Sequence, residues 1–196
     1  MKEFKSERRL NKIVNTLKRR QYDLMVVLEN IHDPHNVSAI FRTCDAVGIP
    51  KVSLVYTIEK FPKIGKKSSA SAFKWVEREK YKSIENCYSP LRKDGYKIYA
   101  SSISEDAKSI YELDLSERLA IVLGNEHRGV SKEASQLADE RIIIPMFGMV
   151  QSLNVSVAAA IILYEAARQR IIKGKYELSQ ISEKELDRLI EQWCSK

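Results

Sequence analysis

Five short apolar runs recur along the chain, and amphipathic segments separate them. The runs cover residues 23–28, 51–56, 96–100, 119–123 and 141–144. A continuous apolar run of this length is typical of a strand buried on both faces, as in a parallel sheet. The alternation of strands and helices therefore predicts an α/β fold with a mainly parallel sheet.

Between these runs, apolar positions recur at helical spacing. The predicted helices cover residues 36–47, 81–93, 131–138 and 152–170. Asn36 and Ser131 are expected N-caps, and Gly48 is expected to end the first of these helices. A break is expected in the second helix at Ser89 and Pro90. Residues 57–80 show neither period clearly.

The two ends of the chain look like helical extensions. Four apolar residues recur at helical spacing in residues 1–20, and Ser182 with Glu185 forms a capping box ahead of a second apolar stripe. We expect both stripes to pack on the core or on a partner subunit. The prediction is an N-terminal extension over 1–20, a central domain over 21–170 and a C-terminal extension over 171–196.

Composition narrows the class of protein. Hydrophobic residues make up 44% and charged residues 30% of the 196 residues, which fits a soluble globular protein. No apolar run reaches the length of a membrane span, and the first residues lack the apolar core of a signal peptide. The three cysteines are far apart, which argues against disulfides and zinc and favours the cytoplasm. His32 and His35 flank Pro34, so a metal site there is not expected either.

The net charge of +7 is concentrated in two segments. Residues 1–20 and residues 60–82 each contain eight Lys and Arg against two Glu, and the remainder is net acidic. Either segment alone fits a solvated surface. Because four aromatic residues also interrupt the second, the two together favour a nucleic-acid partner.

Three polar clusters follow predicted strands. They cover residues 35–42, 124–129 and 144–154, while no GxGxxG motif or P-loop is present. Since the carboxyl ends of parallel strands share one edge of a sheet, the clusters are expected to converge on one cleft.

In order and spacing, the clusters resemble motifs of the SpoU branch of the SPOUT methyltransferases. The first motif is N-x-x-A-I-x-R, from Asn36 to Arg42, and the second is G-N-E-x-x-G, from Gly124 to Gly129. The third runs without a gap from Ile144 to Ala158 as IPMFGMVQSLNVSVA. The resemblance covers roughly residues 21–170, and one departure is the serine at position 38, where many members have glycine.

The resemblance implies a SPOUT fold with a C-terminal deep trefoil knot, a homodimer with a cleft completed across the interface, and S-adenosylmethionine as cofactor. The implied cofactor contacts are Ala100, Ser101, Leu123, Gly124, Ile144, Met146, Ser152 and Leu153. The implied catalytic residues are Arg42, Asn36, Glu126, Ser152 and Asn154.

The implied reaction is transfer of a methyl group to a tRNA ribose 2′-hydroxyl, with guanosine 18 of the D-loop favoured. Arg42 would act as a base or, more easily for a group that stays protonated, as a phosphate clamp. The expected RNA contacts are Arg8, Arg9, Lys12, Arg19, Arg20, His35, Lys63, Lys66 and Lys67. Methylation of ribosomal RNA or of a tRNA wobble nucleotide, or a non-catalytic RNA-binding or folding factor, are the alternatives.

Overall fold

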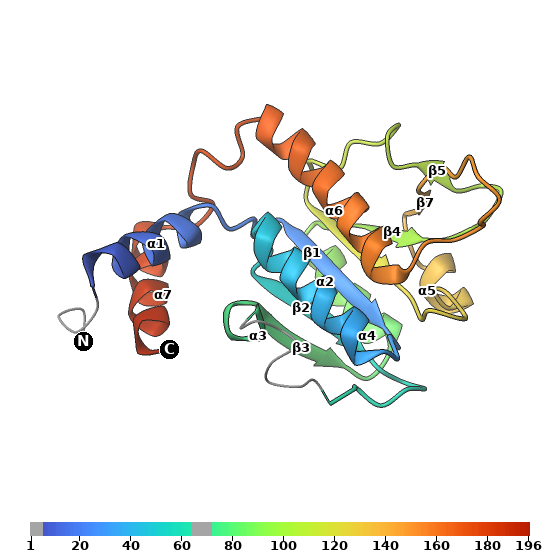
Figure 1. Ribbon diagram of the computed structural model, residues 1–196, viewed down its shortest axis with the longest axis horizontal. Helices are drawn as coiled ribbons and strands as arrows, with labels where there is room; N and C mark the ends of the chain where they lie inside the picture. The colour runs from blue at the N-terminus through green and yellow to red at the C-terminus, as the bar shows by residue number, and fades with distance from the viewer. Residues whose placement is uncertain (1–5, 64–71) are drawn as a thin grey trace.

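The computed structural model describes residues 6–63 and 72–196 (Figure 1). Its centre is a seven-stranded sheet in the order β3-β2-β1-β6-β4-β7-β5, and every pair of neighbouring strands is parallel. The strands are β1 (Leu24–Glu29), β2 (Lys51–Val55), β3 (Glu77–Tyr81), β4 (Lys97–Ser101), β5 (Lys108–Ser109), β6 (Leu119–Leu123) and β7 (Glu140–Ile143). The predicted α/β fold with a parallel sheet is confirmed.

The five apolar runs are the five inner strands, and the two strands that the sequence did not predict lie at the edges. β3 has the sequence EREKY and no fully buried residue, while β5 has only two residues. Charged and short edge strands discourage pairing with other chains. Because four of its five residues are charged, β3 contains no apolar run and was not predicted from the sequence.

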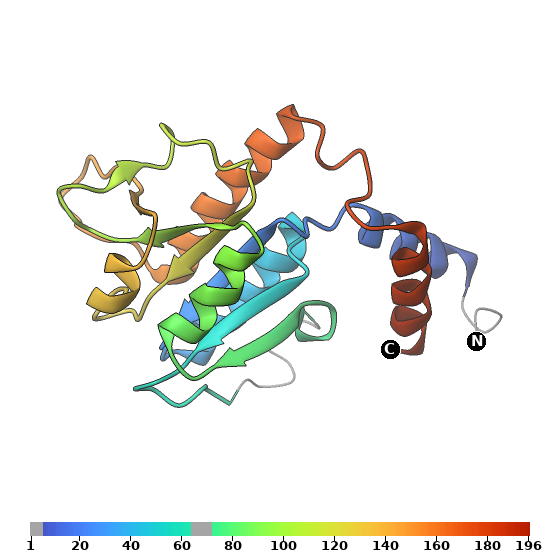
Figure 2. The same cartoon turned by 180° about the vertical axis from the view of Figure 1, so that it is seen from behind.

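Helices cover both faces of the sheet. α2 (Pro34–Val47), α3 (Ala72–Trp75) and α6 (Val155–Ile172) pack on one face, where Figure 1 shows α2 and α6 side by side. α4 (Ile84–Lys93) and α5 (Lys132–Gln136) pack on the other face, seen in Figure 2. Alternate residues of β1 point to opposite faces of the sheet, so that Val26 packs under α2 and α6 and Val27 packs under α4 and α5.

Several predicted helix boundaries are wrong, and the caps explain why. Asp33, not Asn36, caps α2, because its side chain accepts a hydrogen bond from the backbone N–H of His35 at 2.7 Å. Pro34 then takes the first helical position, where a missing N–H costs nothing. Gly48 ends α2 as predicted, with φ at 87°.

α2 thus starts earlier than predicted, whereas two other helices start later. Asn154 caps α6, so Ser152 lies in the loop before the helix. Residues 77–81 form β3, so α4 begins at Ile84, and it continues through Pro90 without the expected break. Ser131 caps α5 as predicted.

The two extensions pack against each other. α1 (Glu7–Lys18) and α7 (Glu183–Ser195) bury their apolar stripes in a common cluster that also includes Trp75 of α3. Figures 1 and 2 show this pair of helices on one side of the sheet. The apolar stripes of the two extensions therefore pack against each other within one chain.

The described residues contain no helix that is both long and apolar enough to cross a membrane. In the same part of the chain, no group of three or more His, Cys, Asp or Glu side chains is placed to hold a metal ion. β7 lies between β4 and β5. The trefoil knot implied by the resemblance stays a prediction.

Candidate functional site

The three polar clusters meet at the carboxyl edge of the sheet, as the sequence predicted. Two neighbouring cavities lie there and share Glu126, His127 and Asn154. We call the larger one the loop cavity, with a volume of about 560 Å³, and the smaller one the Asn36 cavity, with a volume of about 450 Å³.

Three loops enclose the loop cavity. They follow β4, β6 and β7, and they supply a mixture of small, apolar and polar residues. The lining is Ser101, Ser102, Ile103, residues 123–130, residues 152–155 and Ala158.

Gly124 allows the loop after β6 to turn tightly. A Cβ atom at this position would lie 2.1 Å from the backbone nitrogen of Val130 and 2.2 Å from the carbonyl carbon of Gly129. No side chain fits in that space. The second motif therefore needs its first glycine because the chain folds back on itself at the rim of the loop cavity.

A hydrogen-bond network joins the three motifs in the Asn36 cavity. The Asn36 side-chain amide donates to Glu126 Oε1 at 2.8 Å, and the Asn154 amide donates to Asn36 Oδ1 at 3.0 Å. Glu126 also accepts from the backbone N–H groups of His32 at 2.9 Å and Asp33 at 3.1 Å. One residue from each motif is thus fixed relative to the other two.

The donors around Glu126 keep it ionised. Burial raises the pKa of this carboxyl, but the hydrogen bonds from Asn36 and from backbone N–H groups outweigh burial and hold the pKa below its usual range. Glu126 is therefore an anchor for the loop that carries His32 and Asp33, and it is not suited to be a proton donor at neutral pH.

Asn154 has two functions in this geometry. Its side-chain oxygen accepts from the backbone N–H of Ser156 at 2.8 Å and from the Ser156 hydroxyl at 2.6 Å, which caps α6. Its amide nitrogen faces Asn36. The start of α6 is therefore tied to the start of α2 across the cleft.

Sequence reasoning missed Asn30, which organises the edge of the sheet. Its backbone has a positive φ of 51°, and its side-chain oxygen accepts from the N–H groups of Thr57, Ile58 and Glu59 at 3.0 to 3.1 Å. Its carbonyl accepts from the Asn125 amide at 2.8 Å. The only sign of this role in the sequence is that an asparagine, a residue type enriched at positive φ, directly follows an apolar strand.

Glu59 was also missed, because it lies in the segment without a clear period. It binds Arg128 of the second motif at 2.7 Å and His32 at 3.3 Å. The Arg128 guanidinium is the main reason why the pKa of Glu59 lies below its usual range. This ion pair holds the loop after β2 against the loop after β6.

The structure gathers some of the residues implied as cofactor contacts and not others. Ser101, Leu123, Gly124, Ser152 and Leu153 line the loop cavity. The other three lie outside its lining, namely Ala100, Ile144 and Met146. Ala100 instead points into the apolar layer under α4, and Ile144 packs against the core on the opposite face.

Arg42 lies outside both cavities. It is exposed on α2, whereas Asn36 is buried near the start of the same helix. Since this residue is exposed, it is available to a group that approaches from outside the chain. His35 is exposed as well, next to the mouth of the Asn36 cavity.

The predicted RNA-binding residues are mostly, but not all, on the surface. Arg8, Arg9, Lys12, Arg19 and Lys63 are exposed. Lys66 and Lys67 lie outside the described residues.

Arg20 corrects the prediction of a basic surface over the whole N-terminal segment. It is only 1% exposed, and its guanidinium binds Asp45 at 2.6 Å and the carbonyl of Ile49 at 3.0 Å. It therefore fastens the end of α1 to the central domain. Its place in a run of three basic residues, from Lys18 to Arg20, gave no sign of burial in the sequence.

Comparison with known proteins defines the class. Residues 23–164 match the SpoU rRNA Methylase family. The chain belongs to this family, which confirms the resemblance.

Individual relatives match over almost the whole chain. The tRNA (guanosine(18)-2′-O)-methyltransferase of Thermus thermophilus is 43% identical over 192 residues, which cover 98% of each chain. The crystal structure of the Aquifex aeolicus TrmH/SpoU tRNA modifying enzyme matches with a TM-score of 0.90 and 40% identity, over 96% of each chain. The SpoU methyltransferase AviRb from Streptomyces viridochromogenes, in complex with the cofactor AdoMet, matches with a TM-score of 0.66 and 26% identity, over 79% of this chain and 62% of that one.

Proposed function

We propose that this protein transfers a methyl group from S-adenosylmethionine to the ribose 2′-oxygen of guanosine 18 in the D-loop of tRNA. The observation that carries the proposal is the 43% identity, over 98% of both chains, to a tRNA (guanosine(18)-2′-O)-methyltransferase. The match includes both helical extensions, whose α1 and α7 form a pair in this structure. The network of Asn36, Glu126 and Asn154 supports an active enzyme over a non-catalytic binding factor.

The loop cavity fits the cofactor. Its volume of about 560 Å³ is in the range of small-molecule sites, and its lining offers apolar side chains for an adenine ring beside backbone and hydroxyl groups for polar atoms. Ser101, Leu123, Gly124, Ser152 and Leu153 would hold the cofactor. Ala100, Ile144 and Met146 would support these loops from behind. When bound, the cofactor supplies a methyl group on a positively charged sulfur.

The Asn36 cavity would receive the ribose. Because it shares Glu126, His127 and Asn154 with the loop cavity, a 2′-hydroxyl there would lie close to a methyl donor held in the loop cavity. As the new C–O bond forms, the bond between the methyl carbon and sulfur would break, and the hydroxyl would release its proton to an RNA phosphate or to solvent, so developing negative charge needs stabilisation. Asn36 and Asn154 would orient the sugar.

Arg42 would contribute its positive charge to the same step. A guanidinium binds phosphate in a bidentate manner and remains protonated, so it would clamp the RNA backbone and stabilise the alkoxide. Its exposed position on α2 suits a cleft that RNA and a partner subunit complete.

A homodimer accounts for an apolar stripe on α6. Val157, Tyr164 and Ile171 are seven residues apart and are 46%, 57% and 63% exposed. In the preceding loop, Phe147 and Met149 are 97% and 99% exposed. Exposed apolar patches of this kind mark interaction surfaces. A second copy packed on α6 would cover them.

The extensions would serve tRNA binding. Residues 21–170 would form the methyltransferase domain, and 1–20 with 171–196 the helical extensions, with Arg8, Arg9, Lys12 and Arg19 exposed toward the RNA. Lys63 and His35 would extend this surface toward the cleft. A tRNA substrate supports a cytoplasmic location, which we propose for this enzyme.

A methylation assay with labelled cofactor tests the proposal. Unmodified tRNA transcripts and ribosomal RNA are compared, and the modified ribose is mapped. Label at guanosine 18 is expected, and a transcript with 2′-deoxyguanosine at that position should accept none. Label in ribosomal RNA or at the wobble nucleotide would replace the proposed target, and no transfer to any RNA would favour a binding factor.

A further inference from the structure

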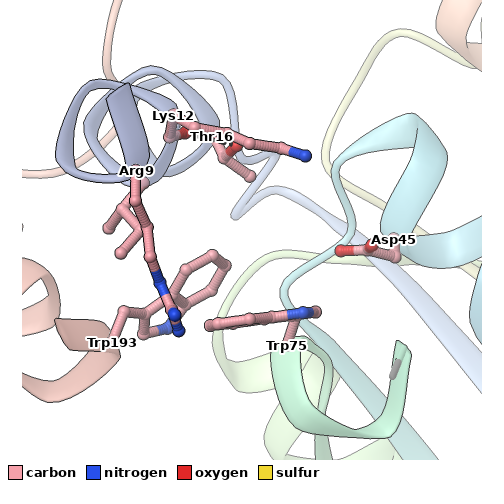
Figure 3. Close-up of a pocket in the computed structure, with 7 residues that line it drawn as sticks. Arg9, Lys12, Thr16, Asp45, Trp75 and Trp193 are labelled. Atoms are coloured by element: carbon pink, nitrogen blue, oxygen red, sulfur yellow. Dashed lines mark hydrogen bonds between the residues drawn. The ribbon is translucent and has the colours of Figure 1, made fainter. Parts of the chain in front are cut away.

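A third cavity, separate from the cleft, lies between the helical extensions and the central domain (Figure 3). Its volume is about 450 Å³. We call it the tryptophan cavity. Its lining comes from four helices, α1, α2, α3 and α7, and consists of Arg9, Lys12, Ile13, Thr16, Asp45, Trp75 and Trp193.

The two tryptophans of the chain both border this cavity. Their ring centroids are 4.7 Å apart, with an angle of 43° between the planes. Trp193 is 7% exposed and forms part of the core of the extensions, while Trp75 is half-buried. The indole ring of Trp75 is therefore accessible to a ligand in the cavity, and the ring of Trp193 packs against that of Trp75.

Cations surround the two indoles. Lys74 and Lys196 place their ammonium groups 5.1 and 5.9 Å from the centre of the Trp75 ring, and Arg20 lies 5.2 Å from that of Trp193. In Figure 3, Arg9 reaches toward the indoles from α1 and Lys12 extends above the cavity. A flat aromatic surface ringed by positive charge is how proteins bind single-stranded nucleic acid.

One acidic group faces the same space. Asp45 points toward the cavity from α2, opposite Arg9 (Figure 3). Its Oδ1 is held by Arg20 at 2.6 Å, and Arg20 also donates to the carbonyl of Trp75 at 3.3 Å. The buried Arg20 thus fixes Asp45 and Trp75 relative to each other before any ligand binds.

We propose that the tryptophan cavity binds one unstacked base of the tRNA, at a nucleotide other than the one that is methylated. The base stacks on Trp75, and Arg9 and Lys12 bind the flanking phosphates. This inference rests on the proposed tRNA substrate. A volume of about 450 Å³ is in the range of ligand sites and accommodates a base with its ribose.

Asp45 gives the cavity a preference among bases. A carboxylate accepts hydrogen bonds from the exocyclic amino groups of guanine, adenine and cytosine. The edge of uracil carries two carbonyl oxygens beside its single N–H, and a carboxylate repels them. Bases with an amino group are therefore preferred over uracil.

Tryptophan fluorescence tests the proposal directly, because Trp75 becomes the only reporter in Trp193→Phe. Titration of this variant with unmodified tRNA should quench the emission along the binding curve. Arg9→Ala should weaken both binding and quenching. Arg8→Ala, on the same helix but outside the cavity lining, should weaken binding through its charge alone and keep the full quench at saturation.

Short RNAs test the preference for a base. Hexamers of adenylate and of uridylate carry the same charge, so only their bases differ. The adenylate hexamer should quench Trp75 at the lower concentration, and Asp45→Asn should reduce this difference. Equal quenching by the two hexamers would overturn the assigned role of Asp45.

Kinetics supply a second readout. Trp75→Leu should raise KM for tRNA by about 5- to 150-fold, the range that corresponds to removal of one base–aromatic stack. The loss should fall on KM rather than kcat, and Trp75→Phe should recover most of it because a stacking surface remains. Circular dichroism checks that each variant is folded.

The outcomes separate this proposal from the proposed function. Methylation of guanosine 18 without quenching of Trp75, and with an unchanged KM in Trp75→Leu, would overturn the base site and leave the enzyme assignment intact. Quenching by tRNA without methylation would support the base site and contradict the assigned reaction. Quenching that follows protein concentration without RNA would show a second copy in the cavity and overturn the proposal.

Discussion

At the scale of single residues, the cleft depends on side chains that hold each other as much as on those that would touch substrate. Glu126 accepts from Asn36 and from two backbone N–H groups, and Asn154 both caps α6 and donates to Asn36. A substitution at one of these positions therefore disturbs the segments before α2, after β6 and before α6 together.

Glu126→Gln should damage both stability and activity. The carboxylate accepts at both oxygens, so an amide would turn one of them into a donor facing other donors. An unsatisfied group of this kind costs about 1 to 3 kcal/mol. Urea unfolding and the methylation assay measure the two losses. Glu105→Gln, at an exposed position outside both cavities, should show neither.

Arg42→Ala should abolish methylation and keep cofactor affinity. Arg42 lies outside the loop cavity, so calorimetric titration with S-adenosylmethionine should give the wild-type affinity. Arg42→Lys should retain part of the turnover if the residue acts as a cation near phosphate. Wild-type turnover in Arg42→Ala would remove this residue from the reaction.

At the scale of elements, buried ion pairs fasten the extensions and α6 to the sheet. Arg170 at the end of α6 is fully buried, binds Asp23 just before β1 and donates to Gln21 at 3.1 Å. Lys175 binds the other oxygen of Asp23 at 2.6 Å. One carboxylate thus joins the start of β1 to the last turn of α6 and to the segment that follows this helix.

Asp23→Asn should destabilise the protein in a pH-dependent manner. Burial raises the pKa of Asp23, but the hydrogen bonds and charges of Lys175 and Arg170 outweigh it and lower the pKa from its usual 3.8. A lowered pKa means that the ionised form stabilises the fold above about pH 4, and that this stabilisation is lost as the pH falls through the folded pKa.

The expected loss at pH 7 is about 3 kcal/mol, because Arg170 remains buried without its carboxylate. Denaturant unfolding at several pH values measures it, and the gap between wild type and variant should narrow below about pH 4. Glu183→Gln, exposed in the first turn of α7, should keep a constant and small gap. A gap at Asp23 that does not depend on pH would contradict this account.

The elements also show how far the sequence alone could lead. The inner strands, α2, α5 and the helices of both extensions follow from apolar patterns, and the caps of α5 and α7 were predicted correctly, whereas that of α2 was not. β3 and β5 do not, because edge strands bury too little to leave a pattern. For the site, the motifs identified Asn36, Glu126 and Asn154. Asn30 and Glu59 were missed because their partners lie in other loops.

At the scale of the whole molecule, two surfaces of the described residues suit the proposed partners. One is the apolar stripe of α6 with the exposed loop before it, and the other is the basic face of α1. The first surface is apolar and should be disrupted by an added charge, whereas the second is basic and should be weakened by salt.

Tyr164→Glu should convert a dimer into monomers. Tyr164 lies in the middle of the α6 stripe and is 57% exposed in the single chain, so a charge there would be buried in the interface. Sedimentation analysis measures the mass. Tyr111→Glu, at a tyrosine that is 60% exposed beyond β5, is the matched control. A monomeric wild type would contradict the dimer.

Binding of tRNA should weaken steeply with salt. Each phosphate neutralised by Lys or Arg adds about 0.9 to the slope of log affinity against log salt for duplex contacts. Arg8→Ala and Arg19→Ala should each lower the slope by about one, as measured by filter binding at several salt concentrations. A nearly flat dependence would exclude the basic face of α1 as the tRNA surface.

The sequence by itself determined the class of fold, the family and the three motifs of the cleft, because apolar periodicity and long ordered motifs are local properties of the chain. Only the tertiary structure decided which side chains meet. It buried Arg20, left Arg42 outside the cavities, and brought Trp75 and Trp193 together from helices far apart in the sequence. Such contacts depend on the packing of distant segments, which no local pattern encodes.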